Sequence, residues 1–218
     1  MEASSLSTRT DDGQQATDPT AAGSRVSFVP SPLADPGPLG LAAFALTTFV
    51  LSFFNAGLVS AAGEPVVFGL AFAYGGIAQF LAGMWEFRTG NTFGAVAFSS
   101  YGAFWLSFWA YVVFYAGKVP EAAAGHAVGL YLIAWGIFTT YMFVASLRTT
   151  AAVAGVFFLL AITFFLLGIG DAGAHSGITK LGGWFGLAAA LVAWYASFAG
   201  VANATFGRTI LPVRPLQR

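Results

Sequence analysis

Six long stretches without a charged side chain constrain this chain more than any other feature of its sequence. They cover residues 39–60, 65–85, 93–115, 124–146, 151–169 and 181–206. Each is close to the roughly 20 residues that a helix needs to cross a hydrocarbon core of about 30 Å. The stretches are apolar on nearly every face, whereas a membrane β-barrel requires strict alternation. The sequence therefore predicts an all-α membrane protein with six transmembrane helices.

Composition excludes several other classes of protein. Charged residues make up 8% of the 218 residues, against roughly 25% in soluble domains. Nine basic and nine acidic side chains without a basic run offer no footprint for a nucleic acid. Zero cysteines and two histidines leave no disulfide, thiol nucleophile, cysteine-ligated zinc or three-histidine metal site. We expect no enzyme, no catalytic residue, no cofactor and no metal site.

The chain divides into three parts by composition. Residues 1–34 are rich in Ser, Thr, Asp, Gly and Ala, which predicts a disordered polar cytoplasmic tail. This tail is not a signal peptide, because the first apolar stretch begins only near Leu39. Residues 35–212 form the six-helix transmembrane domain, and residues 213–218 form a short cytoplasmic C-terminal tail.

The basic residues predict the orientation of the helices, because Lys and Arg are retained on the cytoplasmic side. If the N-terminus is inside, the outer side holds only Lys118 and Lys180. The inner side then holds Arg9, Arg25, Arg88, Arg148, Arg208, Arg214 and Arg218. This imbalance places both termini in the cytoplasm. We expect a multi-pass protein of the plasma (inner) membrane.

An Arg-Thr pair recurs at a spacing of 60 residues, in Arg88-Thr89, Arg148-Thr149 and Arg208-Thr209. Each pair lies at the inner end of an even-numbered helix. The positive-inside rule acting on three hairpins of similar length is one explanation. The other is three related helical hairpins around a pseudo-threefold axis, which would enclose a central pore.

Helix starts on the cytoplasmic side predict a vestibule that attracts anions. In the segment 35–41, Pro38 suits the first turn of a helix, and the free N–H groups that follow lie at the positive end of the helix dipole. Asn91 or Thr92 can cap the third helix. Helix initiation and capping alone also explain these residues. The functional alternative gives a cytoplasmic vestibule of Gly40, Leu41, Asn91, Thr92, Arg88, Arg148 and Arg208.

Glu86 directly follows the predicted span 65–85, at its inner end. It either pairs with Arg88 or acts as a proton-coupling carboxyl, since acids within membranes often have a function. Whether Glu86 is buried decides between these alternatives.

The polar side chains inside the spans are neither strong acids nor strong bases. Phe44, Thr48 and Asn55 share one helical face, which suits either an amphipathic pore or helix contacts bridged by hydrogen bonds. The candidates for steering a substrate are Thr47, Thr48, Asn55, Gln79 and Ser100.

Several motifs resemble the acetate uptake transporter family. In chain order they are DPGPLGL at 35–41, YGGIAQ at 74–79, Glu86-Phe87 with GNTFG at 90–94, SYG at 100–102 with Phe104-Trp105, and FGRTILP at 206–212. The resemblance implies six transmembrane helices, a homohexamer in the lipid bilayer, and passage of acetate and related small carboxylates through each subunit. The family usually has Asn-Pro where this chain has Asp35-Pro36. The aspartate can still cap the helix, but its charge weakens attraction of a carboxylate there.

The resemblance also implies a narrow hydrophobic constriction formed by Phe44, Tyr101 and Leu160. Removing water from a carboxylate costs far more than removing it from the neutral acid, and no span contains a lysine or arginine. We therefore expect proton-coupled uptake. A passive channel for acetate or small neutral solutes, such as urea or ammonia, and a membrane sensor without flux are alternatives. A retinal-based pump is disfavoured because Lys118 and Lys180 lie in loops.

Overall fold

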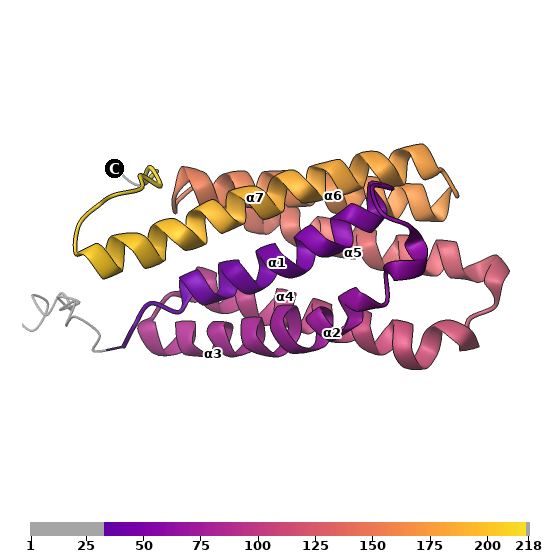
Figure 1. Ribbon diagram of the computed structural model, residues 1–218, viewed down its shortest axis with the longest axis horizontal. Helices are drawn as coiled ribbons and strands as arrows, with labels where there is room; N and C mark the ends of the chain where they lie inside the picture. Colours follow the sequence, from indigo (N-terminus) through magenta and orange to yellow (C-terminus); the bar gives the residue numbers. More distant parts are fainter. Residues whose placement is uncertain (1–32, 217–218) are drawn as a thin grey trace, which may run out of the picture. The chain divides into compact units, whose positions relative to one another are not determined.

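The computed structural model describes residues 33–216, and the expected tail over residues 1–34 lies outside this part of the chain except for residues 33 and 34 (Figure 1). Within residues 33–216 the secondary structure is helical apart from one isolated bridge between Thr150 and Pro215. Six helical segments are long and apolar enough to cross a membrane. The predicted all-α, multi-pass membrane fold is therefore confirmed.

Four spans are single helices, and these are α1 (Gly37–Asn55), α5 (Glu121–Ser146), α6 (Ala151–Ala172) and α7 (Ser176–Phe206). The second span consists of α2 (Val66–Phe72), the π-helical segment η2 (Ala73–Ala78) and α3 (Gln79–Thr89). The third span consists of α4 (Thr92–Ala110), the π-helical segment η3 (Tyr111–Tyr115) and the 3-10 turn η4 (Ala116–Lys118). A short 3-10 helix, η1 (Ala61–Gly63), precedes α2.

The helix starts agree with the capping residues in the sequence. Pro38 lies in the first turn of α1, and Asp35 Oδ1 accepts a hydrogen bond from the Gly37 N–H at 2.8 Å. Asn91 Oδ1 accepts one from the Gly94 N–H at 3.1 Å and caps α4. Helix α1 ends at Asn55 rather than near residue 60, because Gly57 adopts a left-handed conformation with φ +71° that a helix cannot continue through.

Contacts between the helix termini define two ends of the bundle. At one end, Ser197 Oγ of α7 donates to the carbonyl oxygen of Pro38 in α1 at 2.7 Å. The Leu216 N–H donates to the Thr149 carbonyl at 2.9 Å, between α5 and α6. The exposed side chains of Arg88, in the last turn of α3, and of Arg148 and Arg208, just after α5 and α7, lie at this end, which we call the arginine end. At the opposite end lie Glu64 in the connection after α1, Lys118 in η4 and Lys180 near the start of α7, so Lys180 lies in a helix and not in the expected loop.

The closest helix packing does not follow chain order throughout. Helix α6 packs against both α5 and α7, α1 packs against α7, and α3 packs against α4 (Figure 1). A side chain at Gly102 of α4 would place its Cβ 2.6 Å from the backbone nitrogen of Phe80 in α3, so the close approach of α3 and α4 at this point requires glycine. Helices α4 and α5 are consecutive, yet their backbones rarely approach each other. Aromatic side chains and a cavity occupy the space between them.

Candidate functional site

A cavity of about 430 Å³ lies between α1, α4, α5 and α6. On α1 and α6 its lining residues recur at helical spacing, so each helix presents one face to it. These residues are Phe44, Thr48, Leu51, Ser52 and Asn55 on α1, and Leu160, Thr163, Phe164, Leu167 and Asp171 on α6. Each set covers three turns, or about 16 Å along the helix. The cavity is therefore an elongated passage that follows the helix axes.

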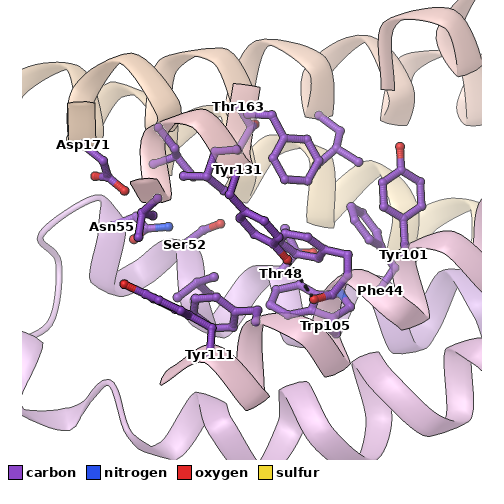
Figure 2. Close-up of a pocket in the computed structure, with 18 of the residues that line it drawn as sticks. Phe44, Thr48, Ser52, Asn55, Tyr101, Trp105, Tyr111, Tyr131, Thr163 and Asp171 are labelled. Atoms are coloured by element: carbon purple, nitrogen blue, oxygen red, sulfur yellow. Dashed lines mark hydrogen bonds between the residues drawn. The ribbon is translucent and has the colours of Figure 1, made fainter. Parts of the chain in front are cut away.

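The three constriction residues implied by the resemblance lie together at one end of this cavity. Phe44, Tyr101 and Leu160 are buried and all line it, and the rings of Phe44 and Tyr101 are 6.0 Å apart. Helices α1, α4 and α6 run in the same direction, and each of these residues is the first of its helix to reach the cavity. These three residues, the trio, therefore lie at the end of the cavity nearest the arginine end. Figure 2 shows Phe44 and Tyr101 at one end of the view, opposite Asn55, Tyr111 and Asp171.

Two of the five expected steering residues line this cavity, Thr48 and Asn55. Thr48 is 5% exposed, and its hydroxyl has no hydrogen-bond partner in the described part of the chain. Thr47, Gln79 and Ser100 are not among the lining residues. The hydroxyl of Thr47 is directed to its own helix, where it donates to the Ala43 carbonyl at 2.9 Å.

The end of the cavity opposite the trio is acidic. Glu64, from the connection between α1 and α2, and Asp171, from the last turn of α6, both line it. Burial raises the pKa of Glu64 above its ordinary value, and the nearby charge of Asp171 raises it further. A second cavity of about 480 Å³ shares Asn55, Val128 and Asp171 with the first and extends to Lys180. The two cavities therefore meet at these shared residues.

Sequence reasoning did not single out Glu64 and Asp171. A signal for Asp171 was available, since it follows the uncharged stretch 151–169 by two residues. It also lies eleven residues after Leu160, which places both on one face of α6. Glu64 directly precedes the uncharged stretch 65–85, but its place at the cavity depends on how the connection after α1 folds back.

The expected vestibule residues belong to the arginine end and line neither cavity. Gly40 is buried, and a Cβ there would be 2.6 Å from the ring of Phe98. Leu41 is half-buried, whereas Asn91, Thr92 and the three arginines are exposed. The exposed groups can meet a solute from the aqueous side, while Gly40 allows close packing of α1 on α4.

Glu86 is 2% exposed, and its Oε2 accepts a hydrogen bond from the Thr89 hydroxyl at 3.1 Å. Its Oε1 also lies 3.5 Å from the position of a Cβ built on Gly37 at the start of α1. Arg88 is exposed. Burial was the deciding property, so Glu86 remains a candidate for proton coupling. Within residues 33–216 no group of three or more His, Asp or Glu side chains is placed to hold a metal ion.

A model of the GPR1/FUN34/yaaH family matches residues 21–218 of this chain. The chain belongs to this family. Within the family, acetate permease A of Emericella nidulans is 46% identical over 196 residues, which cover 83% of this chain and 65% of the relative. The chain thus spans about two thirds of the length of this relative. The succinate-acetate/proton symporter SatP of Escherichia coli (strain K12) is 40% identical over 181 residues, which cover 83% of this chain and 95% of the relative.

A solved member of the family has the same fold. The structure of the bacterial acetate channel SatP superimposes with a TM-score of 0.78 at 39% identity, covering 83% of this chain and 99% of that chain. The family assignment confirms the resemblance read from the motifs. The relatives are named as a permease, a symporter and a channel, which supports the expectation that this family member is not an enzyme.

Proposed function

We propose that this chain carries acetate and related small carboxylates across a membrane, by proton-coupled uptake through the cavity in each subunit. The observation that carries the proposal is the meeting of Phe44, Tyr101 and Leu160 at one end of an elongated cavity. Its volume of about 430 Å³ is within the range of roughly 300–1,000 Å³ for small-molecule sites. Kinship with a permease, a symporter and a channel for acetate supports the substrate class.

The chemistry of the walls suits a short acid with one polar and one apolar end. Phe44, Tyr101 and Leu160 offer an apolar surface for the methyl group, and Thr48 and Asn55 offer hydrogen bonds to the carboxyl group one to three turns further on. Thr47, Gln79 and Ser100 do not line the cavity, so we assign the steering of the carboxyl group to Thr48 and Asn55. No lysine or arginine is among the residues that line the first cavity, so the neutral acid enters at a much lower desolvation cost than the anion. Uptake of the acid with its proton follows.

The arginine end is proposed to be the cytoplasmic vestibule, in which Gly40 and Leu41 belong to the start of α1. The exposed residues of this vestibule attract the anion after it loses its proton, and they are Asn91, Thr92, Arg88, Arg148 and Arg208. Glu86 is proposed to receive that proton, because it is buried beside the start of α1. Asp35 at the same helix start opposes entry of anions from that side.

We further propose that the chain is a homohexamer in the plasma (inner) membrane with both termini in the cytoplasm. The residues 1–34 and 213–218 are then cytoplasmic tails on either side of the domain 35–212. When the two tails are counted with the arginine end, seven basic residues fall on that side and two on the other, which supports this orientation.

The decisive experiment is uptake of labelled acetate into proteoliposomes of the purified protein, with and without an inward proton gradient. Empty liposomes measure the diffusion of acetic acid, which is subtracted. Accumulation beyond the level that acetic acid reaches by itself, dependent on the gradient, supports a symporter. Flux that depends on the protein but ignores the gradient identifies a channel. No flux above the empty liposomes would reject transport and favour a sensor.

A further inference from the structure

The hydroxyl of Tyr101 is tied to the neighbouring helix α5. Its oxygen lies 2.9 Å from Oγ1 of Thr139, and both residues are buried, with Tyr101 3% and Thr139 0% exposed. Figure 2 shows the Tyr101 hydroxyl pointing away from Phe44 and Thr48. The constriction residue is therefore linked to a residue that lines neither cavity.

The direction of this hydrogen bond follows from a second one. The hydroxyl of Thr139 donates to the carbonyl oxygen of Trp135, one turn earlier in α5, at 2.7 Å. A threonine hydroxyl has a single proton, so Thr139 must accept in its bond with Tyr101. The proton of Tyr101 is thus directed to α5 and is not offered to the passage.

The other contacts of the Tyr101 ring are aromatic and less directional. Its centroid is 6.0 Å from Phe44, 5.5 Å from Phe138 and 5.9 Å from Phe157. Such contacts tolerate a range of ring orientations, whereas a hydrogen bond of 2.9 Å fixes the position of the hydroxyl oxygen. Helices α4 and α5 make few backbone contacts, so this bond is one of the few directional links across that wall.

We propose that Thr139 is a positioning residue that holds the Tyr101 ring across the passage and thereby sets the selectivity for short acids. The inference rests on the proposed function, because it assumes that Tyr101 belongs to the constriction. With its proton committed, Tyr101 presents an apolar edge that does not retain a carboxyl group at the narrowest point. Released from Thr139, the ring moves and its hydroxyl competes for the substrate.

The test measures uptake of acetate and of butyrate into proteoliposomes, each corrected with empty liposomes, for Thr139→Val and Thr139→Ser. Valine keeps the shape but cannot accept a hydrogen bond, and we expect the acetate to butyrate ratio to fall about fivefold, the effect of one neutral hydrogen bond. Serine keeps the acceptor and should retain most of the wild-type ratio. Thr140→Val is the matched control, because Thr140 is exposed and donates only to the Gly136 carbonyl.

Tyr101→Phe removes the same bond from the other side and is informative even where Thr139→Val does not fold. It should lower the ratio to a similar value, and Thr139→Val should add little in that background, because the two side chains act as one unit. An unchanged ratio in Tyr101→Phe, or full additivity of the two changes, overturns the role of Thr139. If Phe44→Ala and Leu160→Ala also leave the ratio unchanged, the constriction itself is misplaced and the proposed function fails at that step.

Discussion

Thr48 differs from the other buried threonines in the bonding of its hydroxyl. Thr47, Thr139 and Thr163 each donate to the carbonyl four residues earlier in their own helix. Thr48 makes no such bond and has no other partner in the described chain. A buried hydroxyl without a partner lowers stability by about 1–3 kcal/mol. Such a residue is expected where a substrate supplies the missing partner.

Replacing Thr48 with Val should therefore separate function from stability. The change keeps the shape, so acetate uptake should fall about fivefold, through loss of one hydrogen bond, while the melting temperature of the purified protein should stay equal or rise. Thr47→Val is the control, since the Thr47 hydroxyl serves only its own helix. A drop in the melting temperature of Thr48→Val with unchanged uptake would show that the hydroxyl is structural.

Leu160 is the aliphatic member of the trio, and its truncation to Ala should widen the passage. One additional methylene in a hydrophobic pocket changes discrimination by roughly tenfold or more. We expect Leu160→Ala to relax exclusion of butyrate relative to acetate by on the order of tenfold, measured as corrected uptake in proteoliposomes. Leu159→Ala, on the adjacent half-buried position of α6 outside the cavity, should keep the wild-type selectivity.

At the scale of elements, the sequence determined the number and approximate bounds of the helices, because uncharged apolar runs have few alternatives in a membrane. It did not predict the π-helical segments η2 and η3, since no residue pattern specifies a π turn. It also did not distinguish Thr48 from Thr47 or Gln79. Which face of a helix meets the cavity depends on how the helix packs against its neighbours. A sequence that is apolar on every face does not indicate how the helix is rotated about its axis.

The contact between α3 and α4 should be intolerant of any side chain at Gly102. A Cβ there would lie 2.6 Å from the backbone nitrogen of Phe80, and backbone cannot move aside as a flexible side chain can. We expect Gly102→Ala to lower the free energy of unfolding by about 1–3 kcal/mol or more, seen as a lower melting temperature. Gly69→Ala is the matched control, because a Cβ there meets nothing within 4 Å. Equal melting temperatures for both variants would contradict the close contact.

The connection after α1 should make stability depend on pH through Glu64. Burial, and then the Asp171 charge, raise the pKa of Glu64 above 4.5 in the folded protein. The folded state then binds the proton of Glu64 more tightly than the unfolded state does, so protonation of Glu64 stabilises the fold. This stabilisation is complete at pH values below the ordinary pKa and is lost as the pH rises through the raised pKa.

Glu64→Gln should remove this loss, which melting curves recorded from about pH 4 to about pH 7 would reveal. Asp171→Asn should reduce the loss of stability, because the Asp171 charge is one of the two causes of the raised pKa of Glu64. Glu121→Gln changes an exposed carboxyl at the start of α5 and should leave the pH dependence as in the wild type. The prediction is wrong if Glu64→Gln and the wild type lose stability in parallel as the pH rises.

At the scale of the whole molecule, the direction of uptake depends on which end of the bundle faces the cytoplasm. The chain contains no cysteine, so single cysteines report the orientation without further changes. Arg88 and Arg208 are exposed at the arginine end, and Lys118 and Lys180 are exposed at the other. A maleimide that cannot cross membranes labels only the residues on its own side.

In intact cells we expect Lys118→Cys and Lys180→Cys to be labelled fully, and Arg88→Cys and Arg208→Cys only after permeabilisation. The reason is that arginine and lysine near the ends of spans are retained on the cytoplasmic side, where the arginine end holds the larger number. The cysteine-free parent gives the background, and labelling of permeabilised cells shows that every site is reactive. Labelling of Arg88→Cys in intact cells would show that the orientation is the opposite of the proposed one. The acidic end of the cavity, with Glu64 and Asp171, would then face the cytoplasm, and the proposed entry and exit of the acid would exchange places.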